Sequence, residues 1–309
     1  MRPRQEKFWE NLISRSIMNI SSALEGAKNA LSKAGVQTPA LDALILLCKA
    51  LNYSKEEVIF NPNLILSQSQ KDHFFSLIEL RSKRMPISQL IGRREFFGLN
   101  YIINSDVLDP RPDSESLIEL ALEIFPIKEY SSDNNFEILE LGCGSGCLII
   151  TLLKHYNLAS GLASDISQKA LKICQTNTTL HKIDQRLELA MGDLFNALKN
   201  TKNPKRQFDL IISNNPDLKT RDIDQLEPEV KLYEPRIALD GGESGLDFYQ
   251  KIAANAKNFL KQNGKILLEI GQNQENQIIK IFKDQGFTLY ADKKDLSAVV
   301  RALCFNVSN

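Results

Sequence analysis

The sequence predicts an α/β protein in which a parallel sheet is covered by helices and preceded by a small helical domain. Three observations support this. Strand and helix patterns alternate from about residue 114 to the end, which is typical of a parallel sheet with helices on both faces. The segment from Phe136 to Leu153 passes from an apolar strand through a glycine cluster into an apolar helix. Residues 19 to about 90 have helical spacing.

The composition is that of an ordinary globular protein. The 309 residues include 43% hydrophobic and 25% charged residues, and Lys+Arg and Asp+Glu number 38 each. A net charge of zero argues against broad contact with nucleic acid phosphates, so we expect no direct nucleic acid binding. The five scattered cysteines predict neither a disulfide framework nor a metal site. No apolar run approaches the ~20 residues of a membrane span. The N-terminus lacks the apolar core of a secretory signal peptide, and we expect a cytoplasmic protein.

The N-terminal part is predicted as an extension, residues 1–17, followed by a helical substrate-recognition domain, residues 18–92. Apolar residues recur there at intervals of three and four, as on one face of a helix. Pro86 stops the last long helix because proline cannot continue it. The predicted helices span 20–34, 41–51 and 67–85.

A β-hairpin connector is predicted at residues 93–113, where aromatic and β-branched residues surround Gly98. The third domain is then residues 114–309. Its last two strands follow one another without a helix, so one of them is expected to be antiparallel. The predicted helices are 114–125, 146–156, 167–179, 244–262 and 273–285. The predicted strands are 136–141, 161–165, 187–190, 208–213, 264–269, 287–291 and 298–305.

The glycine cluster predicts a site for a nucleotide-like ligand. Glycines between a strand and a helix let the backbone approach such a ligand closely, but dinucleotide-binding folds use a similar turn. Glu140, just before the first glycine, would repel a pyrophosphate and suits a cationic group such as the ammonium of an amino acid. We expect the whole run to bind the cofactor: Glu140, Leu141, Gly142, Cys143 and Gly144.

Two further acids follow the next two strands. Asp165 can accept hydrogen bonds from both hydroxyls of a ribose, although a helix N-cap is the alternative. Asp193 can accept from the amine of an adenine, with Leu194 packed on the ring; a helix cap is again the alternative. An ammonium, a ribose and an adenine together describe S-adenosylmethionine. The domain is therefore predicted to be a Rossmann-like, class I S-adenosylmethionine-dependent methyltransferase.

A fourth strand ends in Asn214-Asn215-Pro216-Asp217. In this fold the ends of parallel strands face one crevice, so these four residues are expected at that crevice, and Asn214 is also expected beside the cofactor. Arg111 and Glu115 are further candidates for the crevice.

Six segments give the chain a specific resemblance. They are E-F-F-G from Glu95, P-R-P-D-S-E from Pro110, E-L-G-C-G-S-G from Glu140, Y-E-P from Tyr233, L-D-G-G-E-S-G-L from Leu239 and L-E-I-G-Q from Leu268. With these, residues 19 to the end resemble the HemK-type release-factor glutamine methyltransferases. The resemblance implies S-adenosylmethionine as cofactor and peptide-chain release factors as partners. The acceptor it implies is the side-chain amide of the glutamine in their Gly-Gly-Gln loop.

The catalytic signature of that family is Asn-Pro-Pro-Tyr, so the resemblance implies that the matching residues of this chain are catalytic: Asn214, Asn215, Pro216 and Asp217. Here, however, the four residues read Asn-Asn-Pro-Asp. The resemblance implies that the Asn214 side-chain oxygen and the Asn215 backbone carbonyl accept the two N–H groups of the acceptor amide. Asp217 replaces the family's tyrosine, which leaves three outcomes open: a reduced rate, a different acceptor, or a cofactor-binding protein without activity. An adenine-N6 nucleic acid methyltransferase, which shares the Asn-Pro-Pro-Tyr chemistry, is a further alternative.

Overall fold

The computed structural model describes residues 17–130, 136–295 and 297–308, so residues 1–16 of the predicted extension lie outside the described part. The chain forms two compact units. We call them the helical unit, which comprises the residues up to Gly92 together with Glu227–Tyr233, and the sheet unit, which comprises Arg93–Leu226 and the residues from Glu234 onward. Among the described residues, no helix combines the length and the apolarity needed to cross a membrane.

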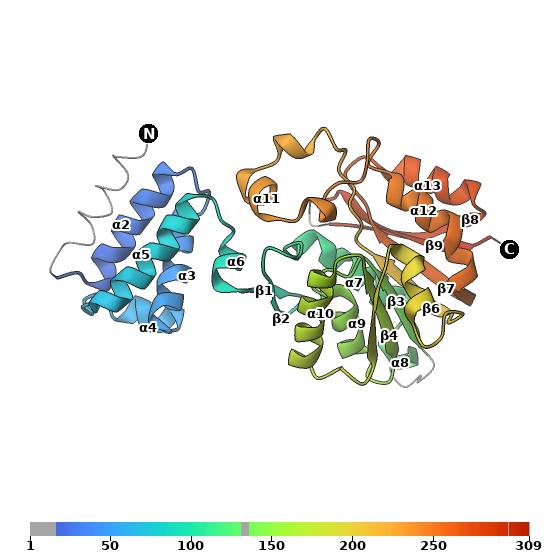
Figure 1. Cartoon of the computed structure of the whole chain (residues 1–309), viewed down its shortest axis with the longest axis horizontal. Helices are drawn as coiled ribbons and strands as arrows, with labels where there is room; N and C mark the ends of the chain where they lie inside the picture. The colour runs from blue at the N-terminus through green and yellow to red at the C-terminus, as the bar shows by residue number, and fades with distance from the viewer. Residues whose placement is uncertain (1–16, 131–135, 296, 309) are drawn as a thin grey trace. The chain divides into compact units, whose positions relative to one another are not determined.

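The helical unit is built from helices (Figure 1), three of which have capped N-termini. Asn19, Ser54 and Ser67 each form a capping box at the start of a helix, which satisfies backbone N–H groups that lack a partner within the helix. The helices are α2 (Ile20–Lys33), α3 (Pro39–Leu51), α4 (Lys55–Phe60), α5 (Gln68–Ser82) and α6 (Ile87–Ile91). Their apolar faces enclose a core that includes Ala23, Leu31, Leu46, Leu47, Phe74 and Ile78.

The predicted helix 67–85 is too long by three residues at its C-terminal end. Helix α5 ends at Ser82, and Arg84 has a positive φ of 69°. An α-helix cannot continue through a residue in the left-handed region. The chain therefore leaves the helix before Pro86, not at it.

A short segment from far along the sequence belongs to the helical unit. Helix α11 (Pro228–Tyr233) lies against α5 and the turn after it. The Tyr233 hydroxyl donates to the Lys83 carbonyl over 2.7 Å, and the Gln89 amide donates to the Tyr233 carbonyl over 2.9 Å. Nothing in the local sequence of 227–233 predicts this association.

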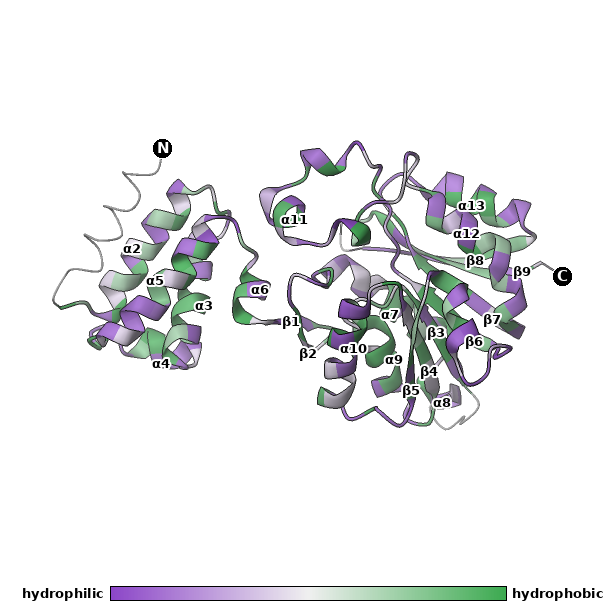
Figure 2. Ribbon diagram, viewed as in Figure 1, coloured by the Kyte–Doolittle hydropathy of each residue, from purple (hydrophilic) through white to green (hydrophobic). Residues whose placement is uncertain are grey.

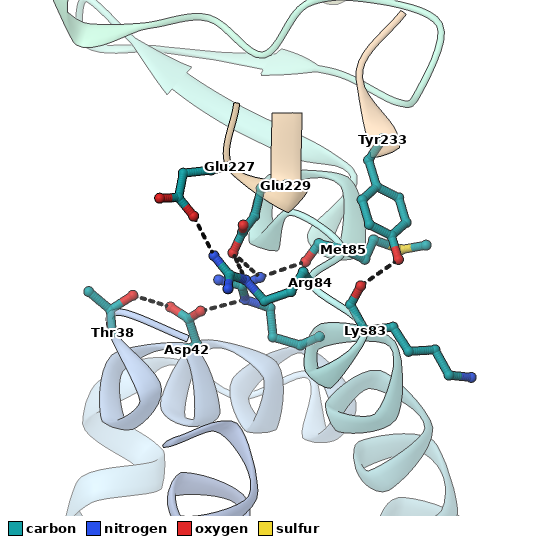
Figure 3. Close-up of polar contacts among 9 residues, drawn as sticks. Thr38, Asp42, Lys83, Arg84, Met85, Glu227, Glu229 and Tyr233 are labelled. Carbon is teal, nitrogen blue, oxygen red and sulfur yellow. Dashed lines mark hydrogen bonds and ion pairs between the residues drawn. The ribbon is translucent and has the colours of Figure 1, made fainter. Parts of the chain in front are cut away.

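A network of charges fixes that segment (Figure 3). Arg81 donates from Nε to Asp42 over 2.7 Å and from Nη1 to Glu229 over 3.0 Å. Arg84 donates to the same Glu229 oxygen over 2.5 Å, and the Thr38 hydroxyl donates to Asp42 over 2.8 Å. Burial raises the pKa of Glu229, but the hydrogen bonds from Arg84 and Arg81 outweigh it, and the pKa lies below its ordinary value.

The sheet unit begins with the predicted hairpin and continues as one seven-stranded sheet. Strands β1 (Arg93–Phe96) and β2 (Leu99–Ile102) pair in antiparallel fashion around Phe97-Gly98. Both turn residues have positive φ, as a two-residue hairpin loop of type I′ requires. The large sheet has the order β5-β4-β3-β6-β7-β9-β8. Its strands are β3 (Glu137–Leu141), β4 (Ser160–Asp165), β5 (Leu187–Met191), β6 (Phe208–Ser213), β7 (Leu260–Glu269), β8 (Phe287–Lys294) and β9 (Val300–Val307).

The expected antiparallel strand is β9, which runs opposite to both of its neighbours, β7 and β8. The other strand pairs, from β5 across to β7, are parallel. The α/β fold class predicted from the sequence is thus confirmed.

Helices cover both faces of this sheet. On one face lie α7 (Glu115–Ile124), α9 (Cys147–His155) and α10 (Gln168–Leu180), and on the other α12 (Asp247–Asn255) and α13 (Glu275–Asp284). Ile138 packs toward the first face, whereas Leu139 and Leu141 pack toward the second, because successive side chains of a strand alternate. Figure 2 shows the hydrophobic colouring of β3 and α9 at the centre of the unit. The short elements are α8 (Ile127–Tyr130), η1 (Pro112–Ser114), η2 (Leu194–Asn200), η3 (Ile223–Gln225), η4 (Arg236–Ala238) and η5 (Ala256–Phe259).

The predicted helix 244–262 and strand 264–269 need correction. The helix ends at Asn255, a turn of tighter helix follows, and strand β7 already begins at Leu260, which pairs with Phe208. Apolar residues at helical spacing continue through Ala256 to Leu260, so the sequence pattern does not mark the change. Pairing with β6 decides where the helix gives way to the strand.

Candidate functional site

A cavity of about 280 Å³ opens where the strand order of the sheet reverses, beyond the carboxyl ends of β3, β4, β5 and β6. Ligands of open α/β sheets bind at this point. The sheet unit alone provides the residues that line it. Ten of the predicted site residues do so: Glu140, Gly142, Cys143, Gly144, Asp165, Asp193, Leu194, Asn214, Asn215 and Pro216.

The glycine loop leaves room at the cavity wall. Gly142 and Gly144 have positive φ angles of 69° and 52°, which side-chain-bearing residues adopt only with strain. A Cβ atom added at either position would meet nothing within 4 Å. The backbone of the loop therefore borders open space, so that a ligand can approach it closely.

Glu140 is buried below this loop, at 2% exposure. Its Oε2 accepts a hydrogen bond of 3.2 Å from Ile149 N, in the first turn of α9. Burial raises the pKa of Glu140 well above its usual value, and the nearby Cys174 adds to this, while the bond from Ile149 lowers it less. Within the described residues Glu140 has no ion-pair partner. A buried acid of this kind gains by meeting a cationic ligand.

Asp165 ties the glycine loop to the next strand. Gly144 N donates to Oδ2 over 2.9 Å and Ser167 N donates to Oδ1 over 2.8 Å. The N-cap of α10 is Ser167, not Asp165, so the capping alternative does not account for this residue. Burial raises the pKa of Asp165, against the backbone hydrogen bonds of Ser167, Gly144 and Ile166. Each carboxylate oxygen retains capacity for a further donor.

Asp193 and Leu194 form another part of the wall. Asp193 starts η2 without a side-chain cap bond, and its carboxylate lies 3.9 Å from the Lys251 ammonium, with 43% of the side chain exposed. Leu194 has a φ of +48°, which is rare for a leucine. Strained backbone of this kind is often found at ligand sites.

Asn214 and Asn215 differ in how their amides are held. Asn214 Nδ2 donates to the Ser114 hydroxyl over 3.1 Å. The Asn215 side chain is 4% exposed, and its Nδ2 has no hydrogen-bond partner within the described residues. An unsatisfied buried donor is costly, and such groups are rare in native proteins.

Asp217 lies outside the cavity wall. Its Oδ2 is 2.5 Å from the position that a Cβ on Gly271 would occupy, and its carbonyl accepts from Gln274 Nε2 over 2.9 Å. Burial raises the pKa of Asp217, whereas Arg301 lowers it. The carboxyl group of Asp217 is therefore turned toward the interior.

Leu141 also lies away from the cavity. Its side chain is fully buried in the core on the α12 and α13 face. Glu140 and Leu141 are neighbours on β3, so their side chains point to opposite faces, and only Glu140 reaches the cavity.

Other residues reach the cavity from segments that are distant in sequence. Arg111 lines it and donates from Nη2 to both oxygens of Glu234 over 2.7 Å. Glu115 instead accepts from Phe97 N and so holds the hairpin. Sequence reasoning missed several residues that line the cavity, whose only signal is their place near recognised motifs: Ser114, Pro235, Ile237, Phe248 and Lys251.

The chain matches two family models, "PrmC N-terminal domain" over residues 22–92 and "Methyltransferase domain" over residues 132–301. It is 35% identical to a release factor glutamine methyltransferase of Agrobacterium fabrum, over 93% of this chain and 96% of that protein. The chain belongs to the release factor glutamine methyltransferase family. A member from Caulobacter vibrioides is also 35% identical, over 91% of this chain and 93% of that protein.

A bifunctional methyltransferase of Rickettsia typhi is 35% identical over 92% of this chain, which spans only 57% of that protein.

Solved structures share the fold at low identity. The catalytic domain of hMettl16, in complex with the MAT2A 3'UTR hairpin 1, has a TM-score of 0.55 and 13% identity, covering 75% of this chain and 83% of that one. The N-terminal domain of human METTL16 in complex with SAH has a TM-score of 0.50 and 17% identity. The match covers 69% of this chain and 77% of that one. The methyltransferase fold is thereby shown.

Proposed function

We propose that this chain transfers a methyl group from S-adenosylmethionine to the side-chain amide nitrogen of the Gly-Gly-Gln glutamine in peptide-chain release factors. The observation that carries the proposal is the cavity, which brings three acids and Asn214 to one end of the sheet. Membership of the family supports the same acceptor. The partner is then a release factor, and the reaction takes place in the cytoplasm.

The residues of the cavity fit the proposed cofactor. The loop around Gly142 and Gly144 leaves open space, and the buried Glu140 suits the ammonium group of a methionine moiety. Asp165 has capacity for ribose hydroxyls, and Asp193 with Leu194 suits an adenine. The two cations that line the cavity, Arg111 and Lys251, are each paired with an acid of the chain. The cavity thus suits a positively charged donor better than a polyphosphate.

The bound cofactor would supply an electrophilic methyl group on a sulfonium. The acceptor amide is a poor nucleophile because its nitrogen lone pair is delocalised into the carbonyl. We assign to the Asn214 oxygen and the Asn215 carbonyl the task of accepting its two N–H groups, so that the nitrogen is aligned. Alignment of two reactants contributes several kcal/mol to catalysis, and the two carbonyl dipoles favour positive charge that develops on the nitrogen.

The replacement of the family's tyrosine by Asp217 is compatible with this activity. Its carboxyl group lies against Gly271, not at the cavity wall. The acid therefore leaves the place of the acceptor free, but it also provides no aromatic surface there. A reduced rate is the outcome we expect from this difference.

Transfer of tritiated methyl groups tests the proposal. The full chain is incubated with labelled S-adenosylmethionine and either a purified release factor, its Gln→Ala variant, DNA or RNA. Label in the release factor that disappears with the Gln→Ala variant supports the proposed function. Label in nucleic acid would instead support an adenine-N6 methyltransferase. Cofactor binding by calorimetry without transfer to any acceptor would show a binding protein that has lost activity.

A further inference from the structure

The side chain of Gln274 connects three loops of the sheet unit. Its Nε2 donates to the Asp217 carbonyl over 2.9 Å and to the Gly245 carbonyl over 3.4 Å. Its Oε1 accepts from Gly271 N over 3.0 Å. Asp217 belongs to the loop after β6, Gly245 to the turn before α12 and Gly271 to the turn after β7. One side chain thereby joins segments that are far apart in sequence, and the first of them contains Asn214 and its three neighbours.

These partners require an amide at position 274. The Gly271 N–H group needs an acceptor, whereas the carbonyls of Asp217 and Gly245 need a donor. The nitrogen and the oxygen of the side chain are therefore assigned by the groups that they meet. Gln274 is the N-cap residue of α13, but its side chain makes no cap hydrogen bond, and glutamine is not among the preferred N-cap residues. Its contacts with the loops explain its place, and capping does not.

Glycines let the loop after β6 come close enough for these bonds. A Cβ atom added at Gly245 would overlap the Asp217 carbonyl oxygen. A Cβ atom at Gly271 would lie 2.5 Å from Oδ2 of Asp217 and 2.8 Å from Oε1 of Gln274, and neither approach is possible without a shift of the neighbouring atoms. Asp217 is thus tightly enclosed by the two turns, and its backbone has little room to move.

The hold on Asp217 extends to the carbonyl that we assign to the acceptor amide. The Asn215 carbonyl lies in the peptide unit that joins Asn215 to Pro216. The ring of Pro216 fixes its φ at about −65°, so the direction of that carbonyl depends on where Asp217 is held. On the other side of the loop, the Ser213 hydroxyl donates to the Leu141 carbonyl over 2.5 Å. The family's signature has a proline at position 215, and this chain lacks the restraint on φ that such a proline supplies.

We propose that Gln274 is a positioning residue, which holds the backbone of Asp217 and thereby directs the Asn215 carbonyl toward the acceptor. The inference rests on the proposed function, since it gives that carbonyl its purpose. Gln274 is not among the described residues that line the cavity, so it acts through the loop and not by contact with the acceptor. Its hydrogen bonds supply a restraint that compensates for the missing proline.

Gln274→Met tests this role, because methionine has a similar length but no N–H donor. The next residue is held separately: Leu218 N donates to the Leu239 carbonyl over 3.2 Å, and Gly241 N donates to the Leu218 carbonyl over 2.8 Å. The variant should therefore fold, while the loop before Leu218 becomes less restrained. For release-factor methylation by the full chain, kcat should fall about tenfold, because the reacting groups are less well aligned.

Cofactor binding and a matched variant control this experiment. Calorimetry of Gln274→Met with S-adenosylmethionine should give unchanged stoichiometry and an affinity within about threefold of wild type, so that the loss appears in kcat alone. Gln277 is an exposed glutamine of the same helix, and Gln277→Met should leave kcat unchanged. The inference is overturned if Gln274→Met retains the wild-type kcat, or if Gln277→Met lowers kcat equally.

Asn215→Pro provides a readout that a merely structural role of Gln274 would not move. The proline introduces a restraint within the loop and does not restore the bonds of Gln274 to the other two turns. It should raise kcat in the Gln274→Met background by about threefold or more beyond its effect in the wild-type chain, since the two restraints act on one loop. An equal effect of the proline in both backgrounds would contradict the positioning role.

Hydrogen exchange followed by mass spectrometry separates this inference from the proposed function, because it needs no methyl acceptor. Peptides that cover residues 213–218 should exchange about threefold faster or more in Gln274→Met than in the wild-type chain. If they do, but the wild-type chain labels no release factor, the proposed acceptor is wrong and the hold of Gln274 on the loop stands. If release factor is labelled and exchange in these peptides is unchanged, the positioning role is wrong.

Discussion

The two units of this protein treat buried acids in opposite ways. In the helical unit, Asp42 and Glu229 are met by Arg81 and Arg84, and the pKa of Glu229 is lowered. In the sheet unit, burial raises the pKa of Glu140, Asp165, Asp217 and Glu269. Paired charges of the first kind hold one segment against another. Acids of the second kind are poorly compensated by the chain itself. Two of them, Glu140 and Asp165, line the cavity, and perturbed acids in a cavity are typical of ligand and catalytic sites.

The largest effect is expected in the helical unit. Arg81→Ala removes the arginine that pairs with the buried carboxylate of Asp42, and should lower the free energy of unfolding by about 3–5 kcal/mol. The double variant Arg81→Met with Asp42→Leu removes both charges and should recover most of the loss. Denaturant-induced unfolding measures the free energy of unfolding of the single and the double variant. If the single and the double variant are equally destabilised, the pairing of charge is not what stabilises the unit.

The next effect concerns the cavity. Asn214→Ala removes the oxygen that we assign to the acceptor amide, and should lower kcat about 100-fold, the usual cost of one lost transition-state hydrogen-bonding group. Cofactor affinity, measured by calorimetry, should change by less than about threefold, because the acids that we assign to the cofactor remain. An equal loss of cofactor affinity would place Asn214 in the cofactor site and not beside the acceptor.

Glu140→Gln tests whether an unpaired buried acid serves ligand binding at a cost in stability. It keeps an oxygen for Ile149 N but removes the charge, so cofactor affinity should fall by about 1.5–3 kcal/mol, the range for a hydrogen bond to a charged group. The free protein should become more stable. A carboxyl group with a raised pKa in the folded state loses stability as pH rises from about 4.5 toward that pKa. The variant should therefore lack this decline, which thermal unfolding measures as the pH is raised above about 4.5. Unchanged cofactor affinity would exclude Glu140 as the partner of the ammonium.

The smallest effect is expected at Asn215. Asn215→Ala removes a buried donor that lacks a partner, and should raise stability by about 1 kcal/mol. The variant retains the backbone carbonyl, so kcat should stay within about threefold of wild type. Comparison of this variant with Asn214→Ala distinguishes a side-chain role at Asn214 from a backbone role at Asn215. A loss of kcat as large as that of Asn214→Ala would show that the Asn215 side chain contacts the acceptor.

The sequence by itself determined the α/β fold class, the hairpin at Phe97-Gly98 and ten residues of the cavity wall. These features depend on local patterns. Alternation along a strand, glycines at a strand end and acids after successive strands are all visible within a few residues. The carboxyl ends of parallel strands necessarily meet at one edge of a sheet, and this places Glu140, Asp165, Asp193 and Asn214 together.

Only the tertiary structure decided which side chains turn toward that edge and which turn away. Leu141 and Asp217 stand within the right motifs but point into the interior, because the face of a strand and the packing of a loop depend on partners elsewhere in the chain. Three other features have the same cause: the association of residues 227–233 with the helical unit, the start of β7 at Leu260, and the hydrogen bond from Asn214 to Ser114. Each joins residues that are far apart in sequence, and no local pattern records such a contact.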